Sequence, residues 1–300
     1  MVSGLMETRP APPDLDPALR ARLMQRRDGP GLRALALHAG AIGLTGWAIA
    51  AGVPGWPLLL PVQGVLIVFL FTLEHECTHR TPFAQGWLCE GAGHAAGFLL
   101  LLPFVWFRYF HLAHHRHTNL PGLDPELDAP KPATPGAWAW HVSGLPYWAG
   151  GAALLWRLAT GRERPAFLPE GARARAEAEA RVMLGLYALA ALSLAVSPVL
   201  FWVWILPVLL GQPVLRLYLL AEHGDCPEVA DMFENTRTTF TTRLVRGLAW
   251  NMPYHTEHHV LPNVPFHNLP EAHRHLRARL RVTEDGYARF TRGYLARRLG

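Results

Sequence analysis

Eight of the 16 histidines in this chain lie in three short motifs, and this clustering strongly constrains what the chain can form. The motifs are His75-Glu-Cys-Thr-His79, His111-Leu-Ala-His114-His115 and His255-Thr-Glu-His258-His259. On an α-helix, residues three or four apart share one face, and imidazole is the commonest side-chain ligand of metals. Eight imidazoles are more than one metal ion uses. We therefore predict a polynuclear site, with two metals held by three helical faces.

The sequence around these motifs is apolar. Half of the residues are hydrophobic and 17% are charged, below the roughly 25% charged residues of an ordinary soluble domain. Apolar stretches cover residues 32–51, 58–73, 182–196 and 200–220, and a membrane-spanning helix needs about 20 such residues. We predict an all-α integral membrane protein, with four transmembrane helices in two hairpins and a cytoplasmic helical cap that carries the metal site. Residues 91–107 are apolar but contain Gly and Pro, which favours a short or half-inserted helix.

The charges indicate the orientation in the membrane. Basic residues gather near the start of the chain and after residue 270, whereas the turns at 52–57 and 197–198 carry no charge. By the positive-inside rule, both termini and all three histidine motifs face the cytoplasm, and we expect a bacterial inner membrane. A basic stripe can also bind nucleic acid, but the apolar content favours anionic lipid, and no nucleic-acid partner is predicted. We divide the chain into a basic, Pro-rich arm (1–30), a membrane domain (31–280) and a basic tail (281–300).

Several residues outside the motifs are candidates for the site. His223 follows the last apolar stretch beside Glu222, and an ionisable pair at a membrane boundary is functional by default. We predict it as a ninth ligand, with a hydrogen-bonded interfacial histidine as the alternative. A carboxylate of the acidic run 124–128 can accept the second N–H of a ligand. Asn251 is either an oxygen ligand or a turn residue, and Glu257 is expected outside the ligand set. The remaining histidines are expected to be structural or on the surface: His38, His94, His117, His141, His267, His273 and His275.

The first motif taken alone fits the zinc metalloprotease pattern H-E-x-x-H. In that pattern two histidines hold zinc and the glutamate, here Glu76, serves as the base. A catalytic zinc needs three protein ligands and one open position, so two further motifs would have no role. An intramembrane zinc protease or a metal transporter therefore remains as a distant alternative.

The complete series of motifs, with a pair of apolar stretches between the second and the third, resembles the membrane fatty acid desaturase superfamily. That superfamily includes acyl desaturases, hydroxylases and carotenoid ketolases. The resemblance covers roughly residues 40–280 and extends to His114-His115-Arg-His-Thr-Asn119 and His258-His259-Val-Leu-Pro262. It implies a non-haem di-iron centre at the cytoplasmic face. The histidines that match the ligands of the family are His75, His79, His111, His114, His115, His223, His255, His258 and His259.

The chain differs from some members of the family at one position, and the absence of one motif bears on the source of electrons. Some animal acyl desaturases carry an asparagine one helical turn before the extra histidine, where this chain has Leu219. The His-Pro-Gly-Gly haem motif is absent from the sequence, so a separate ferredoxin- or cytochrome-type protein is expected to supply electrons. No catalytic residue is predicted beyond the metal ligands.

The resemblance implies an O₂-dependent oxidoreductase that desaturates a lipid acyl chain or acts on another long hydrocarbon. A hydroxylase or ketolase of the same family, acting on acyl lipid or carotenoid, is the alternative. Desaturation and hydroxylation share the first hydrogen abstraction, so the spacing of the ligands does not separate them.

The charge pattern makes a prediction about topology. A reporter fused after Gly300 should lie in the cytoplasm, so a C-terminal fluorescent protein should be bright and a C-terminal alkaline phosphatase inactive. Fusions truncated at residue 54, in the first uncharged turn, should show the opposite pattern. An active phosphatase at residue 300 would contradict the four-span arrangement.

Overall fold

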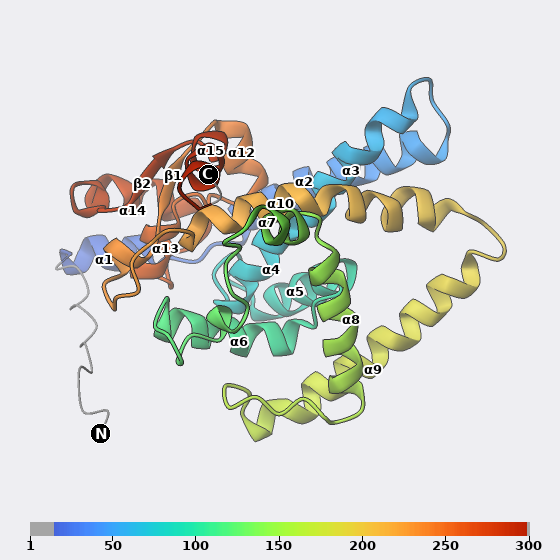
Figure 1. Ribbon diagram of the computed structural model, residues 1–300, viewed down its shortest axis with the longest axis horizontal. Coiled ribbons are helices and arrows are strands. Elements are labelled where there is room, and N and C mark those ends of the chain that lie inside the picture. The colour runs from blue at the N-terminus through green and yellow to red at the C-terminus, as the bar shows by residue number, and fades with distance from the viewer. Residues whose placement is uncertain (1–14, 299–300) are drawn as a thin grey trace.

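The computed structural model describes residues 15–298, and this part of the chain is mostly helical (Figure 1). Its two short strands, β1 (Thr238–Phe240) and β2 (Thr283–Asp285), pair in parallel. The first half of the described chain contains α1 (Pro17–Leu23), α2 (Asp28–Ala50), α3 (Leu59–Val68), α4 (Leu70–Thr78), α5 (Gly86–Leu100), α6 (Phe104–His117), α7 (Pro135–Val142) and α8 (Leu145–Ala159). The second half contains α9 (Glu170–Ser193), α10 (Leu206–His223), α11 (Met232–Asn235), α12 (Arg243–Leu248), α13 (His255–Val260), α14 (Leu269–Leu276) and α15 (Tyr287–Arg298).

Three helical stretches are long and apolar enough to cross a membrane: Pro17–Ala50, Trp56–Thr78 and Phe201–His223. They contain three of the four predicted spans. A fourth can be counted if α5 and α6, which meet at 99°, form one broken span. The bend follows from the local sequence, because Leu101 adopts a left-handed conformation and Pro103 precedes α6 as its N-cap. The short helix expected within residues 91–107 is thus a pair of helices with a sharp corner.

The predicted span 182–196 is not among these stretches. It forms the second half of α9, whose middle carries Glu177, Glu179 and Arg181, and the helix ends at Ser193. From the turn near residue 197, α9 and α10 diverge (Figure 1). The main contacts of α9 are with α6 and α8, whereas those of α10 are with α3. The charged segment before residue 182 and the apolar segment after it are one continuous helix.

The helices α3 and α10 make the closest helix contact of the fold. Gly64 of α3 lies against the backbone of Pro207 and Gly211 in α10, and neither glycine has room for a Cβ. Glycine lets two helix backbones approach within the membrane, where dispersion contacts replace the hydrophobic effect as the driving force. This contact fixes α10 against α3, which leads directly into α4, so the helices that carry His223 and the first histidine motif are held in one assembly.

The residues after α10 form a cap at the end of these helices, away from the turns near residues 52 and 197 (Figure 1). Leu23 of α1 is buried there with Leu269 and Leu276 of α14. The predicted basic tail 281–300 contains β2 and α15, and Phe290 and Tyr294 of α15 pack against Leu220 and Ala221 of α10. Of the predicted N-terminal arm, residues 1–14 lie outside the described residues, and the rest forms α1 and the start of α2.

The glycine contact yields a prediction about stability. Gly211→Val should destabilise the protein by about 1–3 kcal/mol or more, because the added side chain collides with the backbone of α3. The apparent melting temperature of the detergent-purified protein would measure this. Gly185→Val is the matched control, since Gly185 is a helical glycine of α9 with open space around it. Equal melting temperatures for the two variants would contradict the α3–α10 contact.

Candidate metal centre

Four helices bring the nine predicted histidines together, and all nine are buried. His79 is the C-cap residue of α4, and His75 lies one turn before it. The second motif occupies the last two turns of α6, His223 ends α10, and α13 begins at His255. The i and i+4 spacing of each motif turns its imidazoles to one helix face. The four helices converge with these faces inward.

Five of the histidines form a first group: His75, His79, His111, His115 and His258. Each offers one ring nitrogen, and these atoms all lie within 4.8 Å of one another. The closest pairs are His75 Nε2 with His258 Nε2 at 2.8 Å and His79 Nε2 with His111 Nε2 at 2.9 Å.

The other four histidines form a second group. Ring nitrogens of His114, His223 and His259 lie within 4.8 Å of one another. His255 joins them, because its Nε2 is 3.1 Å from Nε2 of both His223 and His259. The two groups touch where the rings of His115 and His259 stack with centroids 4.0 Å apart.

The donor set fits metal ions. Two imidazole nitrogens bound at right angles to one metal, each at about 2.1 Å, are about 3 Å apart, which matches the separations in both groups. His115 is buried and neither of its ring nitrogens has a hydrogen-bond partner among the described residues, a costly arrangement unless a ligand completes it. Burial lowers the pKa of His255, His258 and His259 well below the usual value, and neighbouring imidazoles lower it further. This shift favours the neutral form of imidazole, which is the form that binds metals.

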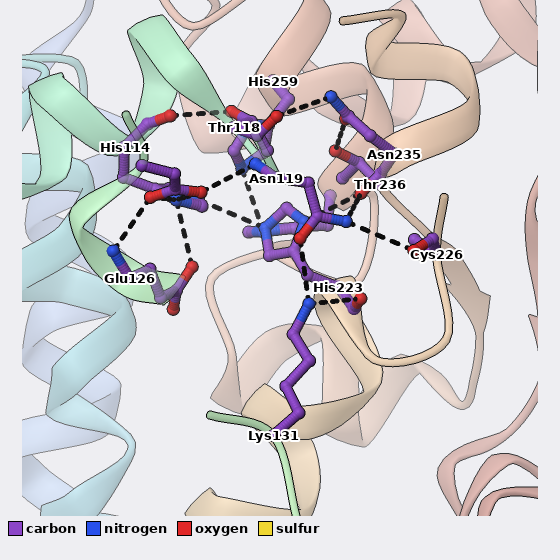
Figure 2. A network of polar contacts seen from close by, with 12 residues as sticks. His114, Thr118, Asn119, Glu126, Lys131, His223, Cys226, Asn235, Thr236 and His259 are labelled. Atoms are coloured by element: carbon purple, nitrogen blue, oxygen red, sulfur yellow. Dashed lines mark hydrogen bonds and ion pairs between the residues drawn. The ribbon is translucent and has the colours of Figure 1, made fainter. Parts of the chain in front are cut away.

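Fixed acceptors hold the outer ring nitrogens of three of the four histidines in the second group. His114 Nδ1 donates to the carboxylate of Asp124 at 3.0 Å, and His223 Nδ1 donates to the carbonyl of Asn235 at 3.1 Å. The Thr118 hydroxyl donates to the His114 carbonyl and so accepts from His259 Nδ1, 3.1 Å away (Figure 2). Such partners fix the tautomer and turn Nε2 inward, as in known metal sites. Asp124 supplies the role that the sequence assigned to the acidic run 124–128.

A polar network braces this outer layer and was not foreseen from the sequence. Lys131 donates to Asn119 Oδ1 and to the His223 carbonyl, both at 2.9 Å. Asn119 Nδ2 donates to the carbonyls of Cys226, Pro227 and Asn235, and Asn235 Nδ2 donates to the Thr118 carbonyl (Figure 2). The bonds go mostly to backbone carbonyls of the loop after α10, so no short sequence motif marks them.

Two buried carboxylates lie behind the ligands rather than among them. Glu76 accepts from the Thr81 hydroxyl at 2.7 Å and from the Phe266 N–H at 3.1 Å. Its other oxygen is 3.8 Å from Nδ1 of His258, the outer nitrogen of that ring. Glu222 likewise lies 3.4 Å from His255 Nδ1. Because Glu76 contacts the outer side of a histidine, its position does not suit the base of a zinc protease.

The other candidate residues lie outside both groups. Glu257 accepts from the Thr238 hydroxyl and pairs with His273, so His273 has the structural role rather than the surface one. Asn251 has a positive φ of 58° and donates to the Phe266 carbonyl, which is the turn role rather than the ligand role. His38 is buried, lies 2.7 Å from the Leu66 carbonyl and accepts from the Trp250 indole.

A cavity of about 580 Å³ opens beside the histidines. Its inner wall contains Phe71, Phe107 and Leu219, each one helical turn before a histidine of the groups. The rings of Phe107 and His111 have centroids 5.5 Å apart. The cavity therefore places apolar surface directly against the candidate metal centre.

The model of the fatty acid desaturase family matches residues 54–291, which include all nine histidines. The chain belongs to the fatty acid desaturase family. It is thus an enzyme of the desaturase-like type, and its apolar helices are those of an integral membrane protein.

Curated relatives of this desaturase-family chain are similar over short segments. A sn-1 oleoyl-lipid 12-desaturase of Picosynechococcus is 38% identical over 76 residues, which are 24% of this chain and 22% of that protein. An endoplasmic-reticulum omega-3 fatty acid desaturase of Vigna radiata is 34% identical over 27% of this chain and 20% of its own length. A sn-1 oleoyl-lipid 12-desaturase of Anabaena variabilis is 27% identical over 36% of this chain and 35% of its own. The matched segments span about a fifth to a third of these relatives.

The outer shell yields a prediction about metal affinity. Asp124→Asn should weaken metal binding by about 10–100-fold, because the charged acceptor that orients His114 is lost. Metal retention by the purified protein during a chelator titration would measure this. Asp128→Asn is the control, since Asp128 is exposed and only four residues away. Equal retention by the two variants would show that Asp124 does not support a ligand.

Proposed function

We propose that the nine histidines bind two iron ions and that the enzyme desaturates a lipid acyl chain with O₂. His75, His79, His111, His115 and His258 would hold one iron, and His114, His223, His255 and His259 the other. The two groups of converging ring nitrogens support this division. Iron suits imidazole sites that activate O₂, whereas one catalytic zinc would use three of the nine ligands.

When bound, the two irons would supply the oxidising power that removes hydrogen from an unactivated CH₂ group. The reaction balances as follows: –CH₂–CH₂– with O₂, two electrons and two protons gives –CH=CH– and two molecules of water. The chain itself orients the ligands through Asp124, Thr118 and Asn235. Phe71, Phe107 and Leu219 place a hydrocarbon against the site and exclude water from it.

The single observation that carries this proposal is the apolar cavity whose inner wall adjoins the histidine groups. It suits a flexible hydrocarbon and is lined by aromatic and aliphatic side chains where they meet the ligands. The names of the relatives agree with it, since they include acyl-lipid desaturases of cyanobacteria. Fatty acid conjugases of Dimorphotheca sinuata and Calendula officinalis are also among them, so a related modification of an acyl chain is the second candidate.

The electrons would come from a separate ferredoxin- or cytochrome-type protein, since one relative from Nostoc is named as a ferredoxin-dependent desaturase. We further propose four spans, with both termini and the metal centre on the cytoplasmic side of a bacterial inner membrane. The membrane domain 31–280 would lie between the N-terminal arm and the basic tail.

Expression in a host that supplies an electron donor tests this function. Purified protein should contain two irons per chain and no stoichiometric zinc, and host lipids should gain acyl chains lighter by two hydrogens. His115→Ala should lose iron and product, because five imidazoles would become four. His275→Ala, which changes an exposed histidine, should keep both. One zinc and no iron would overturn the proposal, and a product heavier by one oxygen or a ketolated carotenoid would establish a hydroxylase or ketolase.

A further inference from the structure

Arg216 places a positive charge inside the otherwise apolar part of the cavity. It lies on α10, within the membrane-spanning stretch Phe201–His223, and lines the cavity together with Leu219 and Phe107. A charged side chain in a membrane span is costly, and such residues usually mark a ligand or its path. The metal ligands do not account for this arginine.

Within the described residues, Glu126 and Glu222 act on the charge of Arg216 only from beyond ion-pair distance. Its Nε is buried and makes no hydrogen bond, and no ion pair joins it to a carboxylate of the described residues. Its guanidinium carbon lies 4.7 Å from the ring centroid of Tyr147, whose hydroxyl donates to the Leu100 carbonyl. By contrast, Arg157 of the same cavity is paired with Glu163 at 2.6 Å. Arg216 is therefore fixed by an aromatic face and has donors to offer.

Arg216 lies on the same helix as His223, one of the candidate metal ligands. Arg216 and His223 are seven residues apart on one helix, which corresponds to about 10 Å along the axis and nearly the same face. Leu219 lies between them and also lines the cavity. A molecule bound to Arg216 can thus extend along this face of α10 to the histidines.

We propose that Arg216 binds the oxygen atoms at the polar end of the substrate, a carboxylate or an ester carbonyl. This inference rests on the proposed function and deepens it, because it makes Arg216 a specificity-determining residue. A planar guanidinium donates two parallel hydrogen bonds to such oxygens. With the polar end held about two helical turns from His223, the metal centre meets carbons at a set distance from that end. A pure hydrocarbon would leave the arginine unpaired and is rejected, as sites built for a hydrogen bond reject analogues that lack it.

Direct binding to the purified, iron-loaded protein tests this role without turnover. The probes are cis-parinaric acid, its methyl ester and a conjugated tetraene hydrocarbon of the same length, each followed by energy transfer from tryptophan. Arg216→Met should weaken binding of the acid, the ester or both by about tenfold or more and leave binding of the hydrocarbon unchanged. A loss for the acid alone identifies a free carboxylate, and a loss for both identifies the carbonyl. Arg216→Lys, which keeps the charge but not the planar fork, should fall between.

Arg181→Met is the control, because Arg181 is an exposed arginine of α9 paired with Glu177 outside the cavity. Iron content and gel-filtration behaviour should match the wild type in all three variants. Equal affinity of wild type and Arg216→Met for both oxygenated probes would overturn the inference. If the wild type binds the oxygenated probes more tightly than Arg216→Met does but forms no desaturated product, the proposed function is overturned instead. In an active enzyme, Arg216→Met should also spread the double bond over several positions.

Discussion

The structure depends on one constraint: nine imidazoles must point their inner nitrogens at the same small volume while that volume stays dry. Neighbouring Nε2 atoms 2.8–3.3 Å apart are stable only with a partner between them, and each outer nitrogen needs an acceptor in a buried layer. Asp124, Thr118 and the Asn235 carbonyl meet this need for three of the four histidines in the second group. The helices α4, α6, α10 and α13 serve mainly to bring these rings to one place.

The requirement for convergence explains features far from the histidines. The glycine contact between α3 and α10 sets the position of His223, because a bulkier pair would move α10 away from α3. The sharp corner between α5 and α6 lets the second motif return to the first. The cap, with α15 packed on the end of α10, covers the site and supplies the third motif. The same helices leave a cavity whose inner wall is one helical turn from the ligands.

At this cavity, the apolar surface of the helices adjoins the candidate metal centre. Aromatic side chains of α4 and α6 line the part next to the histidines, and the half-buried Arg216 lies farther down α10. The aromatic side chains favour binding of an apolar chain, and Arg216 favours binding of a polar group. In the proposed reaction, the protein contributes orientation and exclusion of water, and the metals contribute oxidising power.

The sequence by itself was enough to predict the nine candidate ligands and most of the spans. Each motif is local, so the 3.6-residue period brings its histidines to one face whatever the rest of the chain does. Only the tertiary structure decided how the nine histidines divide into two groups, because that depends on the approach of helices distant in sequence. It also placed Asn251 in a turn, His273 beside Glu257 and the predicted span 182–196 in a partly charged helix. The contacts of Asn235 and Lys131 are mostly with backbone carbonyls, and Arg216 contacts a ring face and lines a cavity. Such contacts produce no periodic pattern in the sequence.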